Sequence, residues 1–126
     1  MPSLPRLSNV TVLVAEDDDD FREAFVAWLA VEGATVREAT NAVEAMAILA
    51  EWTPSVVFTD LMMPGGDGRT LLTSVRSREA SRALPVIAMS ANGMTAKSVR
   101  GEGFDEFLPK PIDFGRLVSL VLSLAP

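Results

Sequence analysis

The sequence predicts an α/β protein built on a parallel β-sheet. Short β-branched runs alternate five times with longer amphipathic stretches along the chain. Repeated strand–helix units of this kind form a parallel sheet with helices on both faces. Most of the short apolar runs are continuous rather than alternating, which is typical of strands buried on both faces. The chain has 126 residues, of which 48% are hydrophobic, and this suits one compact domain with a packed core.

The first unit begins with a continuous apolar run at 10–15, which we expect to be a buried strand. Gly33 can end the helix that follows, and a weaker second strand is expected at 34–38. The helix itself is indicated by an apolar stripe at helical spacing, which consists of Phe21, Ala24, Phe25, Trp28 and Leu29.

The second helix has a start signal, because Asn41 and Glu44 have the spacing of a capping box. The third strand is expected at 55–59 and leads directly to Asp60. The apolar set of this second helix is expected to be Val43, Met46, Ile48 and Leu49.

Glycine and proline punctuate the next part of the chain, at Pro64, Gly65, Gly66 and Gly68, and predict a loop there. The fourth strand is expected at 85–89, ending at Ser90. The helix between this loop and the fourth strand is indicated by Leu71, Leu72 and Val75.

The last units are a short, poorly marked helix at 95–102, a fifth strand at 104–109 and a final helix capped by Asp113. We place an N-terminal extension at 1–9 and the folded domain at 10–126. The final helix is indicated by Leu117, Val118, Val121 and Leu124.

Composition excludes several classes of function. With 17 acidic and 11 basic residues the formal net charge is −6, which argues against direct binding of nucleic acid. The absence of cysteine and histidine excludes disulfides, thiolate nucleophiles and metal sites built from these residues. Any bound metal must be held by oxygen, which points to Mg²⁺, Mn²⁺ or Ca²⁺.

The expected location is the cytoplasm. The longest uninterrupted apolar run, 24–31, is far shorter than the roughly 20 residues that span a bilayer. The start of the chain also lacks the apolar stretch of a signal peptide.

Polar side chains follow four of the predicted strands at their carboxyl ends: Glu16 and Asp17, then Asp60, Ser90 and Lys110. In a parallel sheet these ends meet at one edge, where ligands bind. Two carboxylates about 4 Å apart repel each other by roughly 4 kcal/mol at an effective dielectric near 20, so the acids favour a bound cation such as Mg²⁺. A carboxylate can attack phosphorus, and a metal with a lysine neutralises the charge of the transition state.

Four blocks of the sequence resemble the signature blocks of response-regulator receiver domains, which act in two-component phosphorelays. The resemblance extends over about 10–124. The blocks are 12–18 (Val-Leu-Val-Ala-Glu-Asp-Asp), 60–64 (Asp-Leu-Met-Met-Pro) leading to Gly68, 86–91 (Val-Ile-Ala-Met-Ser-Ala) and 107–111 (Phe-Leu-Pro-Lys-Pro).

The resemblance implies a single-domain flavodoxin-like (βα)₅ fold with strand order 2-1-3-4-5. It implies that Asp60 is the phospho-acceptor and that Asp17 is a direct Mg²⁺ ligand, with Mn²⁺ as a substitute. Glu16 would act mainly through water, and the backbone carbonyl of Met62 would be the third protein ligand. Lys110 would pair with the phosphoryl group.

The resemblance also implies conformational roles. Ser90 would be the switch hydroxyl, and Phe107 the aromatic side chain that changes rotamer with it. The Lys110–Pro111 bond is a candidate for the cis isomer. Met62 and Asn92 would tune dephosphorylation, and because an apolar Met62 cannot orient a water molecule, we expect slow self-dephosphorylation.

Two departures from the family pattern stand out. The distance from Ser90 to Lys110 is 20 positions, slightly fewer than is usual, so residues are missing from the fourth helix or its loop. Phe107 stands where many relatives carry tyrosine, which removes a hydroxyl that partners could contact.

The sequence therefore predicts a phosphorylation switch that catalyses only its own phosphorylation and dephosphorylation. The expected donor is a histidine kinase, a histidine phosphotransfer protein or a small phosphodonor. The protein would be a monomer or a phosphorylation-dependent dimer, either free-standing or part of a hybrid kinase or a longer regulator. Two alternatives are a receiver-like binding module that is not phosphorylated and a Mg²⁺-dependent phosphohydrolase, which turnover of a substrate would reveal.

Overall fold

The structure is a computed structural model, and it describes residues 5–63, 67–91, 93 and 96–124. Its strands form one parallel sheet with the order β2-β1-β3-β4-β5. This is the flavodoxin-like order that the resemblance implied, and the fold prediction is confirmed. The strands are β1 (Thr11–Ala15), β2 (Thr35–Ala39), β3 (Val56–Asp60), β4 (Val86–Ser90) and β5 (Glu106–Pro109).

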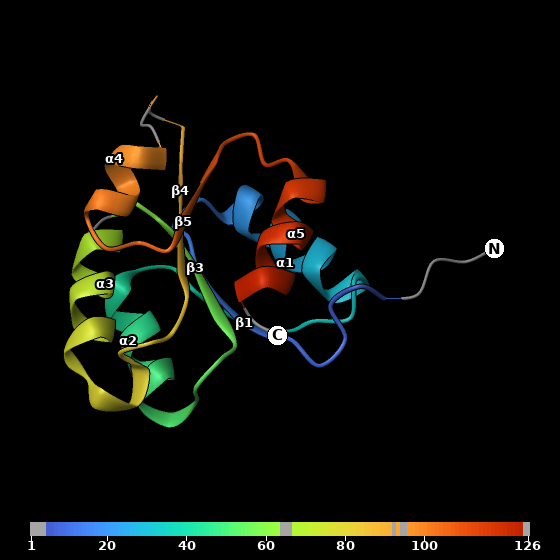
Figure 1. Cartoon of the computed structure of the whole chain (residues 1–126). Coiled ribbons are helices and arrows are strands. Elements are labelled where there is room, and N and C mark those ends of the chain that lie inside the picture. The colour runs from blue at the N-terminus through green and yellow to red at the C-terminus, as the bar shows by residue number, and fades with distance from the viewer. Residues whose placement is uncertain (1–4, 64–66, 92, 94–95, 125–126) are drawn as a thin grey trace.

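Helices cover both faces of the sheet, with α1 and α5 on one side and α2, α3 and α4 on the other (Figure 1). Side chains alternate across the strand plane, so β1 supplies both cores: Val12 and Val14 face α1 and α5, while Leu13 and Ala15 face the other three helices. The helices are α1 (Asp19–Val31), α2 (Ala42–Glu51), α3 (Gly68–Ser77), α4 (Ala96–Gly101) and α5 (Phe114–Leu124), with a short 3₁₀ helix η1 at Glu79–Ser81.

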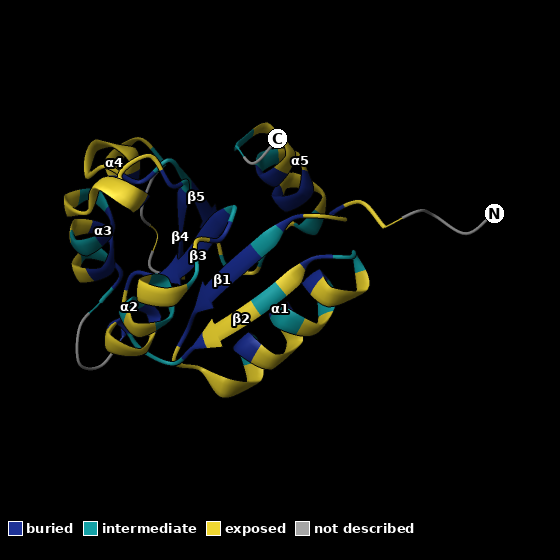
Figure 2. Cartoon of the chain, turned by 90° about the horizontal axis from the view of Figure 1, so that it is seen from below, coloured by how far each residue is buried: buried dark blue, intermediate teal, exposed yellow. Residues whose placement is uncertain are grey.

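The weak signal of the second strand has a structural cause. The strand β2 lies at the edge of the sheet, and most of its residues are exposed (Figure 2). By contrast, every residue of β3 and β4 is buried. An edge strand carries less apolar sequence than a central one, and its pattern is therefore harder to recognise.

Two positions of the predicted apolar stripes are wrong. Val43 is 70% exposed, because α2 faces the sheet with its small residues Ala42 and Ala45. Ala24 is also exposed, because the buried side of α1 is centred on Phe25 instead. The error at Val43 arises because a stripe drawn through the larger hydrophobic residues gives the alanines of α2 no weight.

The start of α2 differs slightly from the capping box that its sequence predicts. The Asn41 side chain accepts a hydrogen bond from the N–H of Glu44, as expected for the N-cap. The Glu44 carboxylate, however, accepts from the backbone N–H of Thr40, at 2.7 Å, one residue before the cap. Two side chains therefore hold the helix start, but the carboxylate of Glu44 bonds to Thr40 and not to the N-cap residue Asn41.

Residues just before the first strand pack on the domain. Leu7 is fully buried, and its N–H donates to the Glu32 carbonyl at 2.7 Å. Arg6 donates two side-chain hydrogen bonds to the Glu32 carboxylate. Gly33 has φ +97°, and a Cβ there would lie 2.8 Å from the Cβ of Pro5, so this corner requires glycine. The domain boundary at residue 10 stays a prediction.

In the part of the chain that the structure describes, none of the helices has the length and hydrophobicity needed to cross a membrane.

Candidate functional site

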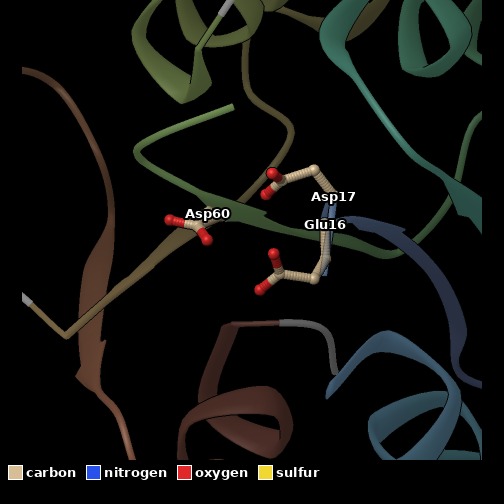
Figure 3. Close-up of side chains that lie close together, drawn as sticks. All are labelled: Glu16, Asp17 and Asp60. Carbon is tan, nitrogen blue, oxygen red and sulfur yellow. The ribbon is translucent and has the colours of Figure 1, made fainter. Parts of the chain in front are cut away.

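Three carboxylates converge at the carboxyl edge of the sheet. Glu16 and Asp17 directly follow β1, and Asp60 is the last residue of β3. Oxygen atoms of the three side chains lie within 4.8 Å of one another, and the side chains point toward a common space (Figure 3). The parallel pairing of β1 with β3 brings these positions together although they are far apart in the sequence.

A single ammonium group connects two of these acids. The Nζ atom of Lys110 lies 2.5 Å from Oε1 of Glu16 and 3.0 Å from Oδ2 of Asp60. The backbone also holds Lys110 in place, since its N–H donates to the carbonyl of Ser90 at 3.0 Å. Partial burial opposes the charge of the ammonium, but the hydrogen bonds to Glu16 and Asp60 raise the pKa of Lys110 above its usual value.

Glu16 is a fully buried acid. Burial raises the pKa of its carboxyl group to about 7, although hydrogen bonds from Lys110 and from the N–H of Asp18 act in the opposite direction. Both carboxylate oxygens are engaged, one by Lys110 and the other by Asp18. The expected contact of Glu16 with a metal through water stays a prediction.

Asp60 is 9% exposed and is held by the start of the following loop. Its Oδ1 atom accepts a hydrogen bond from the N–H of Met62 at 3.0 Å, and Oδ2 faces Lys110. Gly68 is the first residue of α3 and packs against the backbone of Asp60. A Cβ at position 68 would clash with the carbonyl oxygen of Asp60. Only glycine permits this approach, which explains the glycine at this point of the sequence pattern.

The structure places both predicted switch residues in the sheet, and Ser90 lies on the strand next to that of Asp60. Ser90 is 4% exposed and ends β4, one residue beyond the position that pairs with Asp60. Phe107 is 3% exposed, pairs with Ala88 in the register of β4 and β5, and belongs to the core under α3 and α4. Their switching roles stay predictions.

Three predicted features remain: Met62, Asn92 and the Lys110–Pro111 bond. The side chain of Met62 is 58% exposed. Asn92 lies outside the residues that the structure describes. The Lys110–Pro111 peptide bond is cis, as the resemblance predicted.

Sequence reasoning missed one contributor, Arg22. This arginine is 7% exposed, and its Nη1 atom donates a buried hydrogen bond of 2.9 Å to the backbone carbonyl of Glu16. It also forms ion pairs with Asp19 and Glu38. The available signal was its spacing, because Arg22 stands three positions before Phe25 on the buried side of α1.

The donor set suits a hard divalent cation. The three acids offer only oxygen, which Mg²⁺ prefers. Among the described residues, no hydrogen bond or ion pair engages the Asp17 carboxylate, which is exposed. With one ammonium among three carboxylates, the charge balance also favours a bound cation. Asp17 and Asp60 would ligate it directly, and Glu16 would do so through water.

Comparison with known proteins identifies relatives of this chain. The family model described as the response regulator receiver domain matches residues 12–122. The chain is 35% identical over 117 residues to an uncharacterized 14.6 kDa protein of Leptolyngbya boryana, covering 91% of this chain and 89% of that protein. It is 36% identical over 118 residues to the response regulator Rre1 of Synechocystis sp., covering 91% of this chain but only 51% of that protein.

A solved structure shares the architecture. The receiver domain of the Francisella response regulator 1452 superposes with a TM-score of 0.82 at 30% sequence identity, covering 93% of this chain and 97% of that chain.

Proposed function

Because the chain belongs to the response regulator receiver domain family, we propose that it is a Mg²⁺-dependent switch that accepts a phosphoryl group on Asp60. One observation carries the proposal. The Lys110 ammonium bridges Asp60 and the buried Glu16, beside an Asp17 carboxylate that is free of partners among the described residues. This arrangement combines a nucleophile, a fixed cation and ligands for a second cation.

The chemistry follows from these contacts. An oxygen of Asp60 attacks the phosphorus of the donor, and the bond from phosphorus to the leaving group breaks, giving an aspartyl phosphate. Lys110 is already within hydrogen-bond distance of Asp60, so it is positioned to neutralise the incoming phosphoryl oxygens without a large rearrangement. A bound Mg²⁺ would supply further neutralisation of the same oxygens, held by Asp17, Asp60 and the carbonyl of Met62.

The switch would then respond through neighbouring side chains. The Ser90 hydroxyl would donate a hydrogen bond to a phosphoryl oxygen, and Phe107 would change its packing in response. Phe107 lies in the core beneath α3 and α4, so movement there would alter a surface that an output partner reads. We infer that the phosphoryl donor is a histidine kinase, a histidine phosphotransfer protein or a small phosphodonor, in the cytoplasm.

The lifetime of the phosphorylated form follows from position 62. Met62 is exposed near the acceptor and carries no group that orients water. We expect self-dephosphorylation to be slow, and decay of the phosphorylated protein within seconds would contradict this part of the proposal.

The test is intact-protein mass spectrometry after incubation with acetyl phosphate and Mg²⁺. We expect one phosphoryl adduct on the wild type that is lost in EDTA, released by hydroxylamine and absent from Asp60→Asn. Well-folded protein that gains no adduct would refute the proposal and favour a binding module that is not phosphorylated. Continuous release of phosphate from simple phosphate esters would instead favour a phosphohydrolase.

A further inference from the structure

An apolar groove lies beside the acidic site. Its volume is about 510 Å³, within the range of small-molecule sites. Among the described residues that line it, Lys110 is the only one with a charge. The rest of the wall comes mainly from α1 and from the segment after β5, with Phe21, Ala24, Phe25, Pro111, Ile112 and Phe114.

Lys110 joins this groove to the proposed nucleophile. Its Nζ atom lies 4.2 Å from the ring centroid of Phe21, a cation–π contact, and 3.0 Å from Oδ2 of Asp60. One ammonium group therefore touches both the carboxylate and the aromatic wall. A molecule whose phosphoryl end reaches Asp60 has its other end within reach of the groove.

The wall is suited to a flat, apolar group. Phe25 packs against Phe21 at 5.6 Å and against Phe114 at 6.3 Å between ring centroids. Phe21, Ile112 and Phe114 are only partly buried, so part of their apolar surface faces the groove and gains from being covered. A methyl group would cover little of this surface, whereas an aromatic ring can stack on it.

We propose that the groove binds the leaving group of the phosphodonor, and that the domain therefore prefers aromatic acyl phosphates to acetyl phosphate. The inference rests on the proposed function, because it uses Asp60 as the nucleophile. In the reaction with benzoyl phosphate, Asp60 forms a new oxygen–phosphorus bond while the bond between phosphorus and the benzoyl oxygen breaks. Benzoate leaves with the electron pair, and no proton is transferred.

The test compares the second-order rate constants of labelling by benzoyl phosphate and acetyl phosphate, followed by intact mass in the presence of Mg²⁺. Burial of a phenyl ring in the groove is expected to favour benzoyl phosphate by about tenfold. Phe21→Ala and Ile112→Ala should each reduce this ratio several-fold. Comparing ratios between proteins cancels the intrinsic reactivities of the two donors.

The matched control is Val43→Ala, which removes an exposed apolar side chain on α2, across the sheet from the groove. It should leave the ratio unchanged. A ratio that is the same in the wild type and in both groove variants would overturn the groove inference while leaving phosphorylation of Asp60 intact. Absence of labelling by either donor would overturn the proposed function and this inference together.

Benzylphosphonate should slow labelling of the wild type by acetyl phosphate more than methylphosphonate does, and equal inhibition would also count against the groove.

Discussion

The Nζ atom of Lys110 lies 3.0 Å from Oδ2 of Asp60, so the cation that would receive the phosphoryl group already touches the proposed acceptor. The same ammonium contacts Glu16 and leaves Asp17 to a second cation. The site thus has one fixed positive charge, on Lys110, and leaves carboxylate oxygens for an exchangeable metal ion.

Replacement of Lys110 should slow phosphorylation strongly. In Lys110→Ala, no fixed cation neutralises the transition state, and we expect labelling by acetyl phosphate to fall by about 10²–10³. The chain offers a matched control, because its other lysine, Lys97, is exposed on α4. Lys97→Ala should label at the wild-type rate. Equal loss in both variants would argue for a general effect of charge rather than a role in the site.

Neutralising the acceptor should stabilise the metal-free fold. Asp60→Asn removes one of three clustered negative charges, and we expect the free energy of unfolding in EDTA to rise by a few tenths to about 2 kcal/mol. The gain is limited because Asp60 also accepts a hydrogen bond from Lys110. Urea denaturation measures it, with Glu23→Gln on the exposed side of α1 as the control. Equal or lower stability of Asp60→Asn would contradict repulsion within the cluster.

Magnesium should stabilise the protein through Asp17. Binding to the folded state alone raises the free energy of unfolding by about 2.7 kcal/mol at a concentration one hundred times the dissociation constant. Asp17→Asn should abolish this increase. Asp20→Asn, in the exposed first turn of α1, should retain it. A thermal melt with and without Mg²⁺ tests both variants, and full stabilisation of Asp17→Asn would exclude Asp17 as a ligand.

The buried Glu16 should make metal-free stability depend on pH. Its pKa is about 7 in the folded protein and near 4.3 when unfolded, so the folded state binds the proton more tightly. The resulting stabilisation is complete below the unfolded pKa and is lost as the pH rises through about 7. Glu16→Gln lacks this titration, so its stability relative to wild type, measured in EDTA, should increase from pH 5 to pH 8. A difference that is constant over this range would contradict the raised pKa.

The sequence could predict the position of the acids because strand pairing dictates it. Glu16 and Asp60 each directly follow a predicted buried strand, and parallel strands bring such ends to one edge of the sheet. The observed strand limits differ from the predicted ones by only one or two residues. They differ because strand limits depend on hydrogen bonds that a pattern of side chains does not encode.

The partners of these residues could not be predicted in the same way. Contact between Lys110 and Glu16 depends on the path of a long, flexible side chain, and the burial of Arg22 depends on how α1 is rotated against the sheet. The sequence does contain one sign that Arg22 is buried, because it stands three positions before Phe25 on the same side of α1. Val43 was assigned to the core because hydrophobicity alone does not show that alanines form the contact face of α2.

The most direct test of the central claim is chemical localisation of the phosphoryl group. Phosphorylated protein is reduced with borohydride, which converts an aspartyl phosphate to homoserine, and the digested peptides are sequenced by tandem mass spectrometry. We predict homoserine at position 60 in the wild type treated with acetyl phosphate and Mg²⁺, and none in protein treated without the donor. Homoserine at Asp17 or at another acid, with Asp60 unmodified, would contradict the assignment of Asp60 as the acceptor.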